Sequence, residues 1–329
     1  MTHRFTRRLA VLGSLGLAAL GAAAVFSAPA AAPRIVLQAA AADAKPDAAD
    51  AKPDAADAKP AAAGRVLADV SYGPDPAQKM DLYLPAGFAG PRPGVELIHG
   101  GGWQGGDKNF YMPLGRALAA RGFVAFSVNY RLTPAARYPA QADDVQSATR
   151  WVRAHAGEYH LDPARLGALG DSAGGHLSLI LGTRDTQNST DPALAAQSSH
   201  VQCVVDFYGP SDLTTATPAV PQTDGQKYVA RVLHDLLGGA PQDSPALARA
   251  ASPLFSVDAK SAPTLIITGT DDPLVSPAQS ERMADALRAA GVETTLAVMY
   301  KQGHGFLNPG DPQTYGAMAV EWLTRHLKP

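Results

Sequence analysis

The stretch from residue 166 to residue 176 constrains the fold more than any other part of this sequence. A short apolar run leads into GDSAG at 170–174, a G-x-S-x-G match centred on Ser172, and helix-compatible residues follow. A strand, a sharp turn and a helix in this order lift a serine hydroxyl above the edge of a sheet. The flanking glycines leave room for the strand and the helix to approach each other. Because the chain has 31 glycines, the motif alone is weak, and its meaning depends on what surrounds it.

Two segments that precede the folded part have unusual compositions. Residues 1–32 combine an arginine-bearing start with an apolar, alanine-rich run and then small residues, which is typical of a secretory signal peptide. An uncleaved membrane anchor is the competing interpretation, because the apolar run is near the lower length limit for a span. Residues 33–64 are predicted to be a low-complexity linker, and its part at 42–64 is predicted to be disordered, since the unit Asp-Ala-Lys-Pro recurs there and offers almost nothing apolar to bury. The predicted localisation is secreted or periplasmic, with no stable membrane insertion after cleavage.

From residue 65 to residue 329, apolar runs of strand length alternate with helical patterns. The sequence predicts strands at 66–72, 79–84, 94–98, 123–128, 166–169, 201–207, 264–267 and 292–299, the first two forming an antiparallel pair. It predicts helices at 111–120, 142–156, 176–181, 277–290 and 314–327. This alternation predicts an α/β fold with a mostly parallel central sheet and helices on both faces. Residues 211–252 break the pattern and are predicted to form a small lid insertion over the C-terminal edge of the sheet, where ligands bind.

Charge and cysteine content exclude several classes of protein. The net charge is −2, and no stripe of lysine and arginine with interleaved aromatic residues is visible, so nucleic acid is not an expected partner. The single cysteine, Cys203, excludes an internal disulfide and a cysteine-based zinc site. Because Cys203 lies in an apolar run, we expect a buried structural thiol.

A candidate for each part of a serine-based catalytic site follows a predicted strand. The hydroxyl of Ser172 needs an adjacent base, and the base needs an orienting acid. His304 lies between two glycines in a loop, which fits a base better than a core residue. Asp272 is the predicted acid, and the adjacent Asp271 is the alternative. The order serine, aspartate, histidine differs from that of both serine-protease classes and is the order found above an α/β sheet with a nucleophile elbow.

The residues after the predicted strand 94–98 provide an oxyanion loop. The sequence there is HGGGW at 99–103, and glycines allow backbone N–H groups to turn toward a bound carbonyl oxygen. The predicted donors are the N–H groups of Gly101, Gly102 and Ala173. His99 is expected to fix the loop and not to act as a base. A mechanism of this kind needs no metal and no organic cofactor.

These motifs resemble the α/β-hydrolase esterases of the hormone-sensitive-lipase-like and BD-FAE (bifunctional feruloyl and acetyl-xylan esterase) groups. The matching pieces are HGGGW at 99–103, NYRL at 129–132, YPAQADD at 138–144, GDSAGG at 170–175, FYGPSDL at 207–213, TDDPLV at 270–275 and GHGF at 303–306. The resemblance implies that Asp272 is the acid and that Arg131 and Asp144 are structural partners. The hormone-sensitive-lipase-like group has a helical N-terminal cap where this chain has the linker, which favours the BD-FAE group and a more open site.

The resemblance and the candidate triad together predict a secreted serine carboxylesterase. It is expected to hydrolyse short-chain or aromatic acyl esters through an acyl-enzyme, on a small molecule or on a polysaccharide. One alternative is an amide or peptide hydrolase with the same triad, similar to arylformamidases or prolyl-oligopeptidase-like peptidases. A less favoured alternative is a non-catalytic binding protein on a hydrolase scaffold.

Overall fold

The computed structural model of the chain describes residues 35–37, 64–87, 90–185, 192–306 and 312–328. All of them belong to one compact unit, Arg34–Pro329. The predicted signal peptide and nearly all of the predicted linker lie outside the described residues. Within the predicted linker, ahead of the part expected to be disordered, Ile35–Leu37 forms a short strand, β1, which was not predicted. The sequence Ile-Val-Leu has the strand propensity that the Asp-Ala-Lys-Pro units lack.

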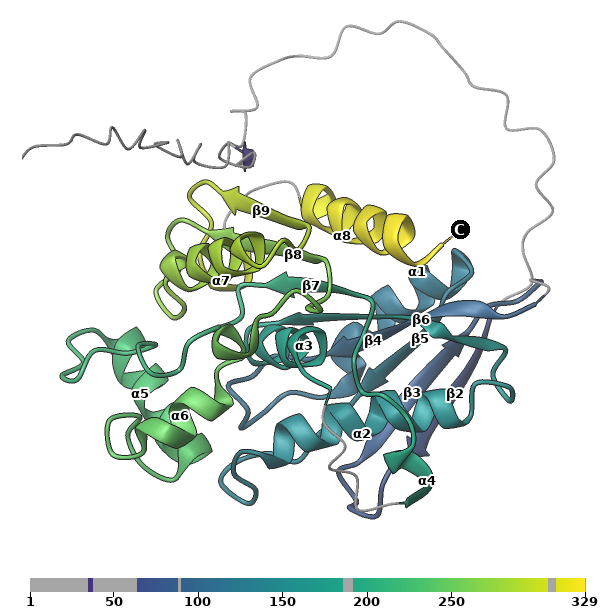
Figure 1. The fold of residues 1–329 in the computed structure, drawn as a ribbon, viewed down its shortest axis with the longest axis horizontal. Coiled ribbons are helices and arrows are strands. Elements are labelled where there is room, and N and C mark those ends of the chain that lie inside the picture. Colours follow the sequence, from purple (N-terminus) through teal and green to yellow (C-terminus); the bar gives the residue numbers. More distant parts are fainter. Residues whose placement is uncertain (1–34, 38–63, 88–89, 186–191, 307–311, 329) are drawn as a thin grey trace, which may run out of the picture. The chain divides into compact units, whose positions relative to one another are not determined.

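A nine-stranded sheet with the order β1-β9-β8-β7-β6-β4-β5-β3-β2 forms the centre of this unit (Figure 1). Its strands after β1 are β2 (Arg65–Ser71), β3 (Lys79–Leu84), β4 (Arg92–Ile98), β5 (Val124–Val128), β6 (Leu161–Asp171), β7 (Cys203–Phe207), β8 (Thr264–Gly269) and β9 (Thr294–Met299). β3 is antiparallel to both β2 and β5, and all other pairs are parallel. The mostly parallel sheet and its antiparallel first pair are therefore confirmed.

Helices cover both faces of the sheet, as predicted. They are α1 (Met112–Ala120), α2 (Ala140–Ala154), α3 (Ala173–Thr183), α4 (Pro192–Ala195), α7 (Pro277–Ala289) and α8 (Pro312–Leu327). Helices α2, α3 and α7 contribute to one buried apolar cluster, and α1 and α8 contribute to a second one. The layered arrangement explains why most side chains of the central strands are apolar, since both faces of the sheet are buried.

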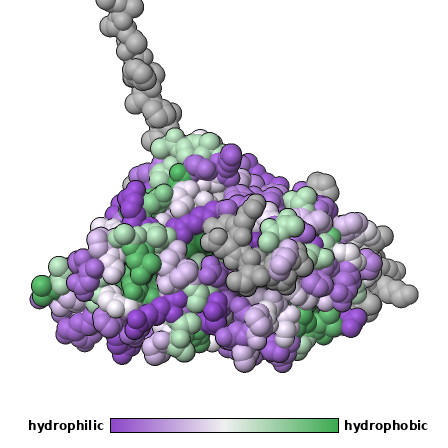
Figure 2. Space-filling model, turned by 60° about the horizontal axis from the view of Figure 1, so that its bottom comes forward, coloured by the Kyte–Doolittle hydropathy of each residue, from purple (hydrophilic) through white to green (hydrophobic). Residues whose placement is uncertain are grey.

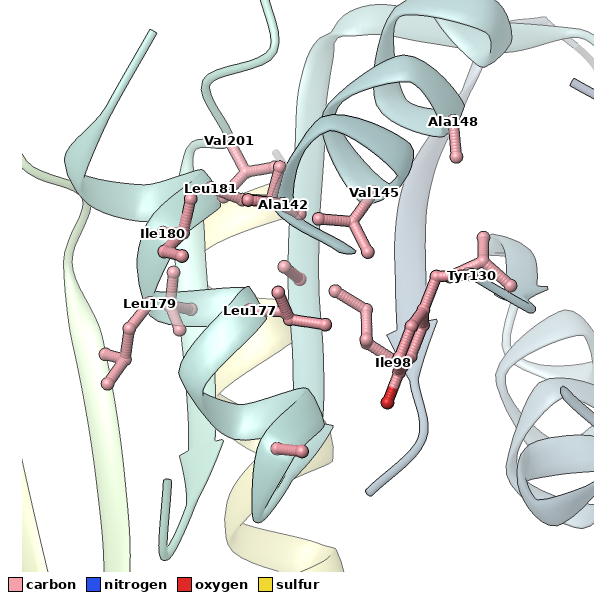
Figure 3. Close-up of a cluster of buried hydrophobic side chains, with 14 of the residues drawn as sticks. Ile98, Tyr130, Ala142, Val145, Ala148, Leu177, Leu179, Ile180, Leu181 and Val201 are labelled. Atoms are coloured by element: carbon pink, nitrogen blue, oxygen red, sulfur yellow. The ribbon is translucent and has the colours of Figure 1, made fainter. Parts of the chain in front are cut away.

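The strands divide their side chains between these two clusters. On β5, Phe126 belongs to the first cluster and Ala125 to the second. Figure 3 shows the first cluster, in which Ile98 from β4 lies among side chains of α2 and α3, including Val145 and Leu177. Cys203 is fully buried in the second cluster, which confirms the predicted structural thiol.

The predicted insertion at 211–252 contains two helices, α5 (Asp224–Leu237) and α6 (Pro245–Ala251). Thr223 and Gln226 form a capping box at the start of α5, and Gly238 ends the helix in a left-handed conformation with φ 80°. The apolar side chains of α5 near Val232 and Leu233 are buried. In Figure 1 both helices lie to one side of the sheet, beside the carboxyl ends of its parallel strands. Side chains of α5 line the pocket described below.

Large apolar side chains are exposed at only a few of the described positions: Phe110, Met112, Val220, Phe255 and Tyr300. On the face seen in Figure 2, hydrophobic residues lie in separate patches among hydrophilic ones. Among the described residues, no helix has the length and apolar character needed to cross a membrane. Phe110 differs from the other exposed apolar side chains because it also lines the pocket.

Candidate active site

Ser172 occupies the turn between β6 and α3. Its φ of 53° and ψ of −118° lie outside the regions that a residue with a side chain ordinarily adopts. Such a conformation costs roughly 1–3 kcal/mol and persists only where the surrounding structure holds it. A methyl group at Gly174 would overlap the carbonyl oxygen of Ile98, and one at Gly170 would overlap that of Gly174. The two glycines of the motif are therefore required by the close approach of β6, α3 and β4.

The structure brings Ser172, His304 and Asp272 together at one edge of the sheet. The Nε2 atom of His304 lies 3.0 Å from Oγ of Ser172, and its Nδ1 atom lies 2.7 Å from Oδ2 of Asp272. The three residues follow β6, β8 and β9, whose parallel arrangement places their carboxyl ends at the same edge. The predicted convergence of these side chains is present, and the geometry is that of a nucleophile, a base and an orienting acid.

The carboxylate of Asp272 is held in a fixed orientation. Its Oδ1 atom accepts hydrogen bonds from the backbone N–H groups of Leu274 at 2.8 Å and Val275 at 2.9 Å, and its side chain is fully buried. An ionised carboxylate only accepts hydrogen bonds, so Nδ1 of His304 donates to Oδ2. The lone pair of Nε2 therefore faces the hydroxyl of Ser172.

The two adjacent aspartates have different surroundings. Asp271 is exposed, and its carboxylate accepts a hydrogen bond from the hydroxyl of Thr270 at 2.7 Å. Its backbone N–H donates to the carbonyl oxygen of Gln302 at 3.0 Å. Of the two candidates for the acid, only Asp272 contacts His304 in this structure.

The loop after β4 turns three consecutive residues into the left-handed region. The φ angles of Gly101, Gly102 and Trp103 are 108°, 61° and 57°. Gly101 and Gly102 line the pocket beside Ser172, as does Ala173. Within the described residues, the backbone N–H groups of these two glycines and of Ala173 have no hydrogen-bond partner. They are therefore available to the oxygen of a bound carbonyl group, which is the role predicted for them.

Asp171 joins this loop to the turn that carries the serine. Its Oδ1 atom accepts hydrogen bonds from the N–H of Gly100 at 3.0 Å and from the hydroxyl of Tyr111 at 2.8 Å. Burial raises the pKa of Asp171, and these two hydrogen bonds act in the opposite direction. His99, at the start of the loop, is buried and stacks on Tyr130 with ring centroids 4.5 Å apart. Burial lowers the pKa of His99, and its contacts confirm the expected structural role.

A cavity of about 330 Å³ opens onto Ser172 and His304. This volume is near the lower end of ligand pockets, which span roughly 300–1,000 Å³. One wall consists of apolar side chains of α5, including Val229, Val232 and Leu233. The predicted insertion thus forms part of the pocket. Within the described ranges, no group of three or more histidine, cysteine, aspartate and glutamate side chains could hold a metal ion.

Several pocket residues could not be identified from the sequence. The ring of Tyr208 contacts that of His304 at a tilt of 58°, with centroids 4.7 Å apart, and Gln279 reaches the cavity from α7. The side chain of Gln279 accepts hydrogen bonds from the N–H groups of Ser211 at 3.0 Å and Asp212 at 2.8 Å, so it also fixes the start of the insertion. The FYGPSDL motif at 207–213 was the available signal for Tyr208, but nothing near Gln279 in the sequence distinguishes it.

Arg131 and Asp144 form a structural ion pair, as the resemblance implied. Nη2 of Arg131 lies 2.6 Å from Oδ1 of Asp144, and Nε lies 2.9 Å from Oδ2. The same carboxylate accepts a hydrogen bond from Gln78 at 2.7 Å. Neither partner lines the catalytic pocket.

Comparison with known proteins identifies esterases as relatives. A family model described as BD-FAE matches residues 80–287. Esterase LipQ of Mycobacterium tuberculosis is 30% identical over 241 residues, which are 72% of this chain and 56% of LipQ. Ethyl acetate hydrolase of Pseudomonas putida is 32% identical over 241 residues, 70% of this chain and 72% of that enzyme. A solved structure of a truncated carbohydrate esterase from gut microbiota superposes with a TM-score of 0.70 at 27% identity, covering 82% of this chain and 99% of that one. The chain spans just over half the length of LipQ and of several other curated relatives.

Proposed function

Because the chain belongs to the BD-FAE family of α/β-hydrolase proteins, we propose that it is a serine carboxylesterase that is exported from the cell. The observation that carries this proposal is the unbroken line of hydrogen bonds from Asp272 through His304 to Ser172, at the edge of a pocket of suitable size. The esterase names of its relatives support the same activity.

Acylation begins with attack of Ser172 on the ester carbonyl carbon. Nε2 of His304 takes the proton of the serine hydroxyl as the new C–O bond forms. Asp272 keeps the imidazole in the reactive tautomer and stabilises the positive charge that develops on it. The proton then passes from His304 to the leaving alcohol oxygen, and the original C–O ester bond breaks. The acyl group remains on Ser172.

The negative charge of the tetrahedral intermediate falls on the former carbonyl oxygen. The N–H groups of Gly101, Gly102 and Ala173 donate hydrogen bonds to that oxygen. One preorganised donor of this kind contributes about 3–4 kcal/mol to lowering the barrier. In the second half of the reaction, His304 takes a proton from water as the water oxygen attacks the acyl carbon. The bond between the acyl carbon and Oγ of Ser172 then breaks, His304 returns the proton to Oγ, and the acid product leaves.

The proposed substrates carry a short or aromatic acyl group. The apolar wall formed by Val229, Val232 and Leu233 suits a hydrocarbon chain or ring, while the cavity volume favours small groups. The relatives include an enzyme named for ethyl acetate and a carbohydrate esterase. With the signal peptide and linker predicted from the sequence, these names support an ester on an extracellular small molecule or polysaccharide. Nucleic acid is not a proposed partner, and no stable membrane insertion is proposed.

A panel of esters tests the proposal. p-Nitrophenyl esters from acetate to palmitate, methyl ferulate and acetylated xylan are offered to the wild-type protein and to Ser172→Ala, with an acyl anilide as the amide control. We expect turnover of acetate, butyrate or ferulate esters that depends on Ser172. Equal turnover by both proteins would remove the esterase proposal. Faster cleavage of the anilide would identify an amide hydrolase, and a preference for palmitate would contradict the proposed acyl size.

A further inference from the structure

Trp103 follows the two glycines of the oxyanion loop and shares their unusual backbone conformation. Its φ is 57°, yet it carries a large side chain that is only 3% exposed. For a residue with a side chain, the left-handed region costs roughly 1–2 kcal/mol. Contacts of the indole ring and the hydrogen bond from the N–H of Thr133 to the Trp103 carbonyl oxygen at 2.9 Å must hold it there. The conformation of Gly102 is directly coupled to that of Trp103 through their shared peptide bond.

The indole of Trp103 reaches across to the helix that follows the catalytic serine. Its Nε1–H donates a hydrogen bond to Nδ1 of His176, on α3, at 3.3 Å. Nε2 of the same imidazole lies 2.8 Å from the carbonyl oxygen of Ala251, the last residue of α6. The two rings meet edge to face, with centroids 5.2 Å apart and planes at 88°. The side chain of His176 thus connects the oxyanion loop, the helix after Ser172 and the end of the insertion.

The partners of His176 determine its tautomer. An indole N–H can only donate and a carbonyl oxygen can only accept, so Nδ1 is the acceptor and Nε2 carries the proton. Protonation of Nδ1 would remove the acceptor that Trp103 uses. His176 is 1% exposed, and burial lowers its pKa to about 4, so the neutral form prevails near neutral pH. Both imidazole nitrogens are therefore committed to a single hydrogen-bonded arrangement.

We propose that His176 is a positioning residue that acts through Trp103 to hold the N–H groups of Gly101 and Gly102 in the orientation that the oxyanion requires. This inference rests on the proposed esterase function, because the role of those N–H groups depends on it. A pocket donor displaced by a fraction of an ångström stabilises the transition state less while substrate binding changes little. Loss of the connection therefore lowers kcat and leaves KM nearly unchanged.

Variants that separate hydrogen bonding from packing test this role. Trp103→Phe keeps an aromatic ring but removes the donor, and His176→Leu removes both nitrogens. His176→Gln supplies an amide that can accept from Trp103 and donate to Ala251. Trp322→Phe is the matched control: Trp322 is a buried residue of α8 whose Nε1 atom has no hydrogen-bond partner among the described residues.

The steady-state kinetics of p-nitrophenyl butyrate hydrolysis are measured for each variant, together with its thermal midpoint. We expect Trp103→Phe and His176→Leu to lose roughly tenfold to hundredfold in kcat, with KM changed less than about threefold. His176→Gln and Trp322→Phe are expected to stay within about threefold of wild type in both constants. The double variant of Trp103→Phe with His176→Leu is expected to lose no more than the more affected single variant, since both act on one connection.

Two results would overturn the inference while leaving the esterase intact. In the first, Trp103→Phe matches Trp322→Phe in kcat. In the second, His176→Gln loses as much kcat as His176→Leu. Should Trp103→Phe fold poorly, the comparison of the two His176 variants decides the question alone. A wild-type protein without turnover that depends on Ser172 would instead overturn the proposed function, and this inference with it.

Discussion

Glu96 provides a test of how a buried acidic side chain makes the stability of the folded protein depend on pH. It lies on β4, the strand that leads into the oxyanion loop, and is fully buried. Its Oε2 atom accepts a hydrogen bond from the hydroxyl of Thr149 at 2.5 Å, and its Oε1 atom has no partner among the described residues. Burial raises the pKa of Glu96 from its ordinary value of 4.5 to about 8. The folded protein therefore holds a proton on Glu96 at neutral pH.

The sign of the pH effect follows from proton binding. Between pH 4.5 and pH 8 the folded state keeps the proton and the unfolded state releases it, so stability falls as the pH rises. The contribution of the proton on Glu96 to the stability of the folded state is fully present below pH 4.5 and is lost as the pH rises to about 8. Each pH unit in this interval is worth 1.36 kcal/mol, so the loss between pH 4.5 and pH 7 is about 3 kcal/mol.

Glu96→Gln removes this titration and keeps the shape of the side chain. The amide oxygen can still accept the hydrogen bond from Thr149, as the protonated acid does. We expect the free energy of unfolding of Glu96→Gln minus that of wild type to increase by about 3 kcal/mol from pH 4.5 to pH 7. Urea unfolding at a series of pH values measures this difference, and other titrating groups cancel because both proteins share them.

Glu321→Gln is the control, since Glu321 is an exposed residue of α8. Its unfolding free energy should follow that of wild type across the same pH range. A constant difference in unfolding free energy between Glu96→Gln and wild type from pH 4.5 to pH 8 would contradict this prediction, because it would mean that Glu96 ionises alike in the folded and unfolded protein.

Three further predictions concern the site. Asp272→Asn should lower kcat for p-nitrophenyl acetate by about 10⁴-fold, whereas Asp271→Asn should change it less than threefold; equal losses would reopen the choice of acid. Gly102→Ala should lower kcat about a hundredfold. The φ of Gly102 is 61°, which is unfavourable for alanine, and the new methyl group would lie 2.9 Å from the hydroxyl oxygen of Tyr228. An unchanged kcat would exclude Gly102 as a donor. Val232→Phe should shift the chain-length profile toward acetate, and an unchanged profile would show that the acyl group binds elsewhere.

Much of the fold could be predicted from the sequence because the pattern of apolar residues within each element matches the way that the element packs in the folded protein. Strands buried on both faces are mostly apolar, with few exceptions such as Glu96 on β4, and the helical runs between them are long enough to be recognised. Ser172, Asp272 and His304 could be identified because parallel strands place the residues after their carboxyl ends at one edge. β1 could not be predicted, since three apolar residues beside an alanine-rich stretch provide too weak a pattern.

Other features of the site depend on contacts between distant parts of the chain. Asp272 could be preferred to Asp271 from the motif that it belongs to, but the backbone N–H groups of the following turn that orient its carboxylate are seen only in the folded chain. The hydrogen bond from Trp103 to His176 joins residues 73 positions apart, and either residue alone is compatible with simple core packing. Tyr208 combines a left-handed φ of 45° with a tilted ring contact to His304, which only the folded chain shows.

The proposed mechanism requires that Ser172 becomes covalently acylated because His304 and Asp272 activate it. Mixing the wild-type protein rapidly with p-nitrophenyl acetate and digesting the acid-quenched sample for peptide mass spectrometry tests this directly. We expect one acetyl group per chain, on Ser172, and its loss in Ser172→Ala and His304→Ala. Acetylation of another residue that turns over at the steady-state rate, or hydrolysis at the wild-type rate by Ser172→Ala, would contradict it.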